Sequence, residues 1–123
     1  RRSSDLNSLQ LLVDALRAFA AERQWEQFHT PKNLACALSV EVAELLEHFQ
    51  WMNEAQSQAL TDSKKAEVSA EAADVFLYLL QLCDKLDIDL VAAARAKMQV
   101  NAEKYPTALA RGTAAKYTDL SPE

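Results

Sequence analysis

The stretch "SAEAADVFLYLLQL", residues 69–82, has the apolar spacing of a helix and carries two acids, Glu71 and Asp74, three residues apart. A second stretch, "SVEVAELLEHFQW" at residues 39–51, repeats this arrangement with Glu41 and Glu44. Because a helix advances about 100° per residue, each acidic pair lies along the flank of an apolar stripe. The two stripes predict two helices that pack against each other with their carboxylates beside the seam.

Four carboxylates in one pocket are unfavourable without a cation, because like charges repel and partial burial removes water from them. We expect no Lys or Arg on the two acidic rows, so a divalent metal is the simplest partner. All-oxygen ligands suit hard ions, and Mg²⁺ ranks before Mn²⁺ because it keeps several waters and binds phosphates readily. The acidic rows therefore predict a Mg²⁺ site, with Mn²⁺ as a possible substitute.

Two other interpretations of the acids exist. They can be solvated edges of amphipathic helices, as most acidic pairs in helical proteins are, and the sequence leaves this alternative open. A di-iron carboxylate bundle is disfavoured, because that architecture uses a Glu-x-x-His step on two helices. Here His48 follows Glu44 by four residues, and the helix around residues 69–82 contains no His.

Composition places the chain among single-domain cytoplasmic proteins that do not bind nucleic-acid polymers. Its 123 residues fit one domain, and a formal charge of −5 lacks the basic excess that phosphate backbones require. Cys36 and Cys83 are expected to be buried thiols in a reducing compartment. The longest apolar run, residues 75–80, is far shorter than the roughly 20 residues of a membrane span.

Apolar periodicity predicts four main helices, and no stretch alternates as a strand would. Thr30 and Pro31 are typical of a helix start, Asp87 or Asp89 can cap the last helix, and Pro106 closes it. The expected helices cover about residues 5–24, 31–52, 62–86 and 90–105, with a short helical turn possible between the second and third, and residues 107–123 form a C-terminal tail. The apolar stripes of the two central helices are Leu34, Leu38, Val42, Leu45 and Phe49, and Val68, Ala72, Val75, Leu79, Leu82 and Leu86.

The last helix carries a row of polar residues suited to phosphate. Lys97, Asn101 and Lys104 follow at i, i+4 and i+7, so two cations and an amide share one face. The same row can instead face solvent. Trp25 and Trp51 stand at the ends of the first two helices, where their rings can fill the core or stack on a base.

The pairs "EVAE" and "EAAD", the entry "FAAERQWEQFHTPKNL" and the exit "KMQVNAEKYP" resemble the MazG-like all-alpha nucleotide pyrophosphohydrolases, most closely the dCTP pyrophosphatase branch. The likeness covers about residues 5–120. It implies an all-α four-helix bundle of the all-alpha nucleoside triphosphate pyrophosphatase type, formed by residues 1–123 as a single domain and completed by oligomerisation. The implied assembly is a homodimer or homotetramer.

The resemblance also implies an activity. Such enzymes cleave nucleoside triphosphates between the α and β phosphates with Mg²⁺, giving a monophosphate and pyrophosphate, in nucleotide-pool house-cleaning. The expected substrate is dCTP or a related deoxynucleotide. The alternative is a helical protein that binds nucleotide or a partner without turnover.

Residue roles carry over by matching motif. Glu41, Glu44, Glu71 and Asp74 would be the metal ligands and catalytic acids, and the substrate-binding residues would be Trp25, Trp51, Tyr78, Lys97, Asn101 and Lys104. Two positions depart from close relatives: Lys104 stands where they tend to have Arg, and Leu16 where they carry His. In the tail, Arg111, Lys116 and Tyr117 resemble residues that close over a neighbouring site.

Overall fold

The computed structural model describes residues 2–114, with side chains from residue 8 onward, and every regular element in this range is helical. The chain divides into two compact units, residues 1–87 and 88–123, which are described separately. The elements are α1 (Arg2–Glu22), the 3₁₀ turn η1 (Glu26–Phe28), α2 (Pro31–Glu47), α3 (Glu54–Gln58), α4 (Asp62–Lys85), α5 (Leu90–Lys104) and α6 (Thr107–Ala110). The predicted all-α class is confirmed.

Helix starts follow the predicted capping residues. The Thr30 hydroxyl accepts the backbone N–H of Asn33 at 3.2 Å, and Pro31 occupies the first turn of α2. Of the two aspartates proposed to cap the last long helix, Asp89 is the one that does so, accepting the Ala92 N–H at 3.0 Å. Each cap satisfies a backbone donor that has no partner within its own helix.

Helix ends differ from the prediction by one to five residues. α1 stops at Glu22 because Gln24 has a φ of 55°, and Asp87 at φ 55° likewise follows the end of α4. α2 ends at Glu47, five residues before the predicted end at Met52. Beyond it the backbone continues in turns, with Phe49 N donating to Leu46 O at 2.9 Å, a bond across three residues rather than four.

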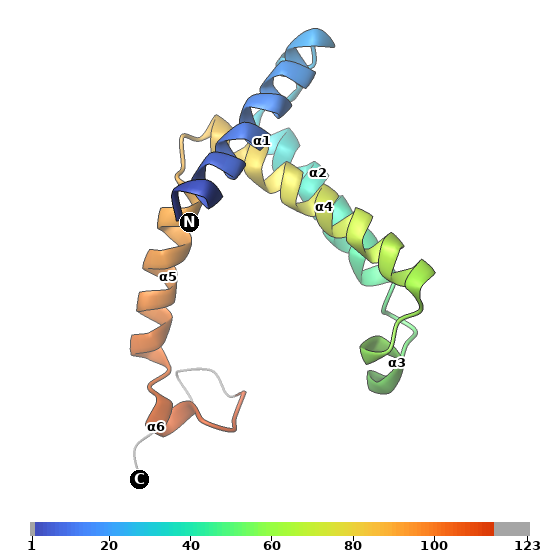
Figure 1. Cartoon of the computed structure of the whole chain (residues 1–123), viewed down its shortest axis with the longest axis vertical. Helices are drawn as coiled ribbons and strands as arrows, with labels where there is room; N and C mark the ends of the chain where they lie inside the picture. The colour runs from blue at the N-terminus through green and yellow to red at the C-terminus, as the bar shows by residue number, and fades with distance from the viewer. Residues whose placement is uncertain (1, 115–123) are drawn as a thin grey trace. The chain divides into compact units, whose positions relative to one another are not determined.

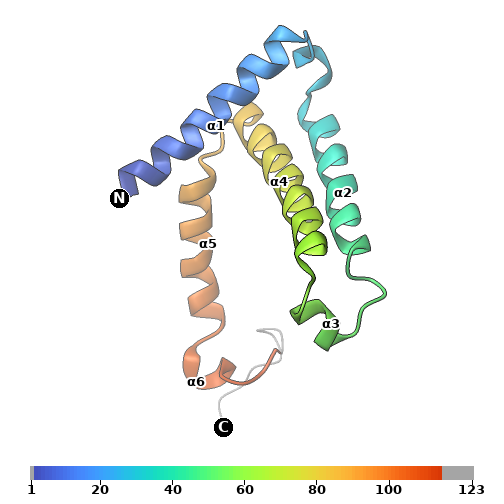
Figure 2. The same ribbon diagram turned by 45° about the vertical axis from the view of Figure 1, so that its right-hand side comes forward.

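In the first unit, α2 and α4 lie side by side and run in opposite directions, with α3 in the connection between them (Figures 1 and 2). Leu34 is the most deeply buried side chain, at 1% exposure. The half-buried residues of the seam are Leu38, Leu45 and Phe49 on α2 and Val68, Val75, Leu79 and Leu82 on α4. Three predicted stripe residues, Val42, Ala72 and Leu86, are instead exposed.

The N-terminal helix α1 packs on α4 near its C-terminal end. Leu80 of α4 lies with Val13, Leu16 and Ala20 of α1 around a small cavity, and Leu80 and Ala20 are both buried. The Arg17 guanidinium donates to both carboxylate oxygens of Asp84, which joins the two helices. This pairing lowers the pKa of Asp84. α1 therefore covers apolar surface of α4, around Leu80, that lies away from the seam with α2.

Few side chains are fully buried. The buried hydrophobic residues of the described part are Ala20, Leu34, Leu80 and Cys83, whereas Leu46 is 62% exposed. The expectation of two buried thiols is wrong for Cys36, which is exposed because it lies away from the α2–α4 seam. No helix in residues 2–114 combines the length and apolar character that crossing a membrane requires.

We expect Arg17→Met to lower the free energy of unfolding slightly at neutral pH, since a bidentate but partly exposed pair is lost. The pKa of Asp84 is lowered in the folded state, so this stabilisation is present at neutral pH and is lost as acid protonates Asp84. Urea titrations of Arg17→Met, Asp84→Asn and the double variant measure the coupling. Lys65→Met, at an exposed position of α4, is the control; equal effects of Arg17→Met and Lys65→Met would contradict the pairing.

Candidate functional site

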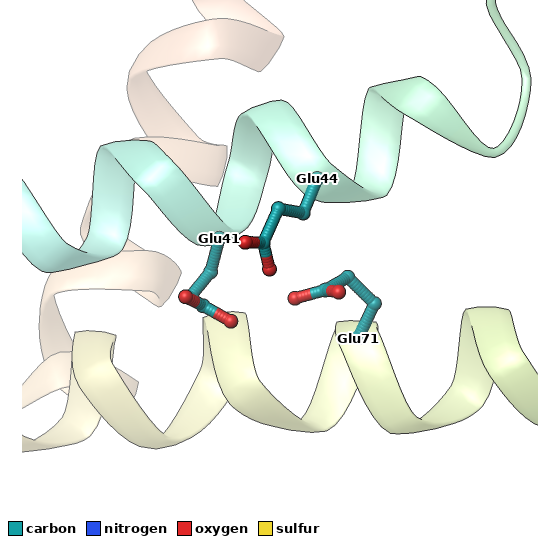
Figure 3. A group of neighbouring side chains, drawn as sticks. All are labelled: Glu41, Glu44 and Glu71. Carbon is teal, nitrogen blue, oxygen red and sulfur yellow. The ribbon is translucent and has the colours of Figure 1, made fainter.

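Three of the four acids predicted to bind metal meet between α2 and α4. Glu41 and Glu44 come from α2 and Glu71 from α4, and one carboxylate oxygen of each lies within 4.8 Å of the others (Figure 3). The side chains point toward one another across the gap between the two helices. All three are half-buried, which the solvated-edge alternative does not predict.

The electrostatics of this acidic group show that its negative charge is poorly compensated. Glu71 Oε2 is closed off from solvent and has no hydrogen-bond partner among the described residues. The pKa of Glu41 is raised, because its neutral form can hydrogen-bond to Glu71, and because lost hydration and the charges of Glu71 and Asp74 oppose its ionisation. Both features favour the binding of a cation by this acidic group.

A nearby basic side chain does not supply that charge. We expected no Lys or Arg on the acidic rows, but Lys64 lies one turn before Glu67 on α4, so that expectation is wrong. Lys64 Nζ is 3.4 Å from Glu67 Oε1 and 3.4 Å from His48 Nδ1. Among residues 8–87, the described part of the first unit, no Lys or Arg forms an ion pair with Glu41, Glu44 or Glu71.

The donor set fits a hard divalent cation. Three carboxylates provide only oxygen atoms, and an unpaired buried oxygen on Glu71 is the kind of group that a metal ion satisfies. Glu41 and Glu44 lie three residues apart on one helix face, so α2 presents both to the same point. We conclude that this group can hold a metal ion.

The fourth predicted ligand, Asp74, lies outside the group of three. It is exposed, and it lines a neighbouring cavity of about 400 Å³ between α1 and α4. Its charge still contributes to the raised pKa of Glu41. Asp74 therefore stands between the acidic group and the cavity, and its role as a metal ligand stays a prediction.

Two of the predicted substrate-binding residues, Trp25 and Tyr78, line this same cavity. The Trp25 ring meets the edge of Phe19 at a centroid distance of 5.7 Å and that of His29 at 6.2 Å. The Arg23 guanidinium lies 3.5 Å from the centre of the Phe19 ring, a cation–π contact that holds the ring in place. The cavity therefore has an aromatic wall at one side and an acid at its edge.

The other predicted substrate-binding residues lie elsewhere in the structure. Trp51 is 88% exposed and borders a second cavity, of about 520 Å³, between the end of α2, α3 and the start of α4. Lys97, Asn101 and Lys104 lie on α5 in the second unit, and their meeting with the acidic group stays a prediction. Arg111 directly follows α6, whereas Lys116 and Tyr117 lie outside the described residues.

Phe19, His29 and Gln81 are among the residues of the cavity wall that the sequence did not assign to the site. The place of Gln81 on the helix face of Asp74 and Tyr78 could have been predicted, because it follows Asp74 by seven residues and Tyr78 by three. His29 follows a 3₁₀ turn, and helical periodicity could not have placed it.

Comparison with known proteins assigns the chain to a family. The model of the MazG-like family matches residues 36–120, which include all four acids. The chain belongs to the MazG-like family. Similar proteins are dCTP pyrophosphatase 1 of Rattus norvegicus, 48% identical over 104 residues, and dCTP pyrophosphatase 1 of Homo sapiens, 44% identical over 104 residues. Each alignment covers 83% of this chain and 61% of the relative, so the MazG-like chain spans under two thirds of their length.

A similar solved structure supports the fold. The crystal structure of a pyrophosphatase from Archaeoglobus fulgidus is 46% identical to this chain and superposes with a TM-score of 0.77. The match covers 80% of this chain and 93% of that one. The helical architecture is thus that of a solved pyrophosphatase.

We expect Glu41→Gln to raise the melting temperature of the metal-free protein by a few degrees at pH 8, because it removes one of the repelling charges. The raised pKa of Glu41 means that the folded protein holds this proton more tightly than the unfolded chain, so this contribution to stability falls as the pH rises through that pKa. The gain from Glu41→Gln should accordingly shrink toward pH 4.

We also expect added Mg²⁺ to raise the melting temperature of the wild type at pH 8 and to raise that of Glu41→Gln much less, since one of the expected ligands has gone. Scanning calorimetry with EDTA or with Mg²⁺ measures both effects. Glu54→Gln, at an exposed residue of α3 that lines neither cavity, is the matched control. A metal-free Glu41→Gln protein less stable than wild type at pH 8 would contradict the repulsion.

Proposed function

We propose that this protein is a Mg²⁺-dependent nucleoside triphosphate pyrophosphohydrolase that cleaves between the α and β phosphates, with dCTP or a related deoxynucleotide as its substrate. The observation that carries the proposal is the group of three carboxylates beside an aromatic-walled cavity, linked by Asp74, in a member of the MazG-like family. The names of its relatives, dCTP pyrophosphatase 1 and a pyrophosphatase, supply the reaction class.

The acidic group would hold the triphosphate end of the substrate. Glu41, Glu44 and Glu71 would bind Mg²⁺, with Asp74 completing the set from the cavity side. When bound, the metal would neutralise phosphate charge and lower the pKa of a water. The oxygen of a water would bond to the phosphorus of either the α or the β phosphate. The bond from that phosphorus to the oxygen that bridges the two phosphates would break, and monophosphate and pyrophosphate would be released.

A carboxylate of the same group would accept the proton of the attacking water. General-base catalysis needs an acceptor within hydrogen-bond reach whose pKa lies nearer to neutrality than that of an ordinary carboxylate. In the metal-free protein, the hydrogen bond with Glu71, lost hydration and the charges of Glu71 and Asp74 move the pKa of Glu41 in that direction. The chain therefore contains both the anchor for phosphates and a base, although any of the four acids can fill the second role.

The cavity would hold the nucleoside. A base can stack on the indole of Trp25, and the hydroxyl of Tyr78 lies on the α4 face between Asp74 and Gln81, where a sugar would sit. On α5, Lys97, Asn101 and Lys104 would contact phosphate and sugar oxygens. An ammonium at Lys104 provides charge without the two-pronged contact of a guanidinium, so its hold on phosphate would be weaker than that of Arg.

We further propose that the protein works as a homodimer or homotetramer. Large apolar side chains stay uncovered in one chain, including Leu46 at 62% and Trp51 at 88% exposure. A surface of this kind is usually covered by association. Trp51, which borders its own cavity, would then reach a substrate only in the assembled protein.

The assay that tests the function is incubation of the protein with a panel of deoxynucleoside triphosphates and Mg²⁺, with the products separated by ion-exchange chromatography. We expect monophosphate and pyrophosphate. Glu44→Gln and Asp74→Asn should each reduce kcat by about 100-fold or more, because metal-held charge stabilises the transition state by several kcal/mol. Glu54→Gln should leave the rate unchanged.

Other outcomes decide between the alternatives. Diphosphate and phosphate as products would refute cleavage between the α and β phosphates. Tight nucleotide binding with no product for any nucleotide would favour the non-catalytic helical protein. Full activity in both Glu44→Gln and Asp74→Asn would contradict the assignment of the acidic group.

We expect Trp25→Ala to raise KM for the nucleotide by about tenfold or more, because one base–aromatic stacking contact contributes roughly 1–3 kcal/mol. Phe28→Ala is the matched control, since Phe28 is an exposed aromatic residue in the same segment that does not line the cavity. Initial-rate kinetics on both variants give the comparison. Equal KM values for Trp25→Ala and Phe28→Ala would show that the base does not stack on Trp25.

A further inference from the structure

One face of α4 presents three polar side chains to the cavity in sequence. Asp74, Tyr78 and Gln81 stand at i, i+4 and i+7, and all three line the cavity wall. Seven residues of helix span about 10 Å, which is comparable to the reach of a nucleotide from its α-phosphate to the far edge of its base. With Asp74 at the metal end, Gln81 lies where the base edge would arrive.

The carboxamide of Gln81 has a fixed orientation. Its Nε2 donates to the backbone carbonyl of Leu77 at 3.2 Å. Because a carbonyl oxygen only accepts, the nitrogen side of the amide must face Leu77. The other side, Oε1, accepts no hydrogen bond from the residues that the structure describes, and it is not among the oxygens sealed from solvent there.

The surroundings of Gln81 make this free acceptor selective. It is half-buried, and toward the larger cavity its neighbours include the apolar side chains of Leu12, Leu16 and Leu77. On its other side Gln81 borders the small cavity that Arg17 and Asp84 also line, where these two charges are paired with each other. Once a ligand displaces water, an acceptor without a donor in such surroundings loses its hydration without compensation. A ligand that places a hydrogen-bond donor against Oε1 of Gln81 is therefore bound more tightly than one that places an oxygen there.

We propose that Gln81 is a specificity-determining residue that selects bases with an exocyclic amino group. Its Oε1 accepts from the amino group of cytosine or adenine, whereas uracil or hypoxanthine presents a carbonyl oxygen at the same ring position. An oxo base would draw the Nε2 side of the amide toward the cavity at the expense of the bond to Leu77. This inference rests on the proposed function, because it places a nucleoside in the cavity.

Two pairs of substrates compare an amino base with its oxo counterpart. In dCTP and dUTP, and likewise in dATP and dITP, the first member has an amino group where the second has an oxo group, and the adjacent ring nitrogen is an acceptor in the first and an N–H donor in the second. The measured quantity is the ratio of kcat/KM within each pair. We expect the wild type to favour the amino member of each pair.

In Gln81→Met, a helix-compatible change of similar length, the preference should fall about tenfold, the usual effect of one hydrogen bond. Gln81→Glu, which keeps an acceptor, should retain the preference for the amino base. Gln10→Met, at an exposed position of α1, should match the wild type. If Gln81→Met loses its helical circular dichroism, Gln81→Ala provides the same measurement.

An unchanged dCTP to dUTP ratio in Gln81→Met or Gln81→Ala would overturn the assignment while leaving the hydrolase activity intact. Loss of the preference in Gln81→Glu would equally overturn it. Absence of turnover for every nucleotide would refute the proposed function instead. In that event calorimetric Kd values of dCTP and dUTP for the wild type and Gln81→Met test the selection by binding alone, and equal Kd ratios would overturn it.

Discussion

The mutual repulsion of Glu41, Glu44 and Glu71 is the constraint on which the rest of the structure depends. Packing α2 along α4 buries apolar surface, but it also brings these carboxylates within 4.8 Å of one another. Glu71 Oε2 is left without a partner, and Glu41 is driven toward its protonated form. A cation bound at the seam, or a proton held between Glu41 and Glu71, would relieve this repulsion. The packing of these two helices thus creates a place that can hold a cation.

Helix α4 connects this constraint to everything else in the first unit. Toward its N-terminal half it carries Glu71, on its cavity face it carries Asp74, Tyr78 and Gln81, and near its C-terminal end Asp84 holds α1 through Arg17. Because α1 supplies Phe19 and the chain that leads to Trp25, the Arg17–Asp84 pair also holds the aromatic wall opposite the acids. Helix α4 therefore contributes both to the stability of the first unit and to the positions of the proposed substrate-binding residues.

Local rules of the sequence predicted the helices, their caps and the meeting of three acids, because these depend on spacing along one chain. They failed where the exposure of a side chain or the place of a residue in a cavity depends on how distant parts of the chain pack. Val42 has the right period for the core yet is exposed, and Cys36 is exposed because no helix within residues 2–87 covers its side of α2. Gln24 and Asp87 adopt left-handed backbone conformations that end two helices. Neither residue is a glycine, so the sequence did not indicate these ends. The position of Gln81 in the cavity wall could be recognised only once the packing of α1 against α4 was known.

The two indoles of the chain occupy very different surroundings, and this gives the protein two built-in optical probes. Trp25 is in edge contact with Phe19 and His29 in the cavity wall, whereas Trp51 stands almost entirely in water. Emission from the first should respond to an occupant of the cavity. Emission from the second should shift to shorter wavelength when another surface covers it. Intrinsic fluorescence can thus follow ligand entry and subunit association as separate signals without any added dye.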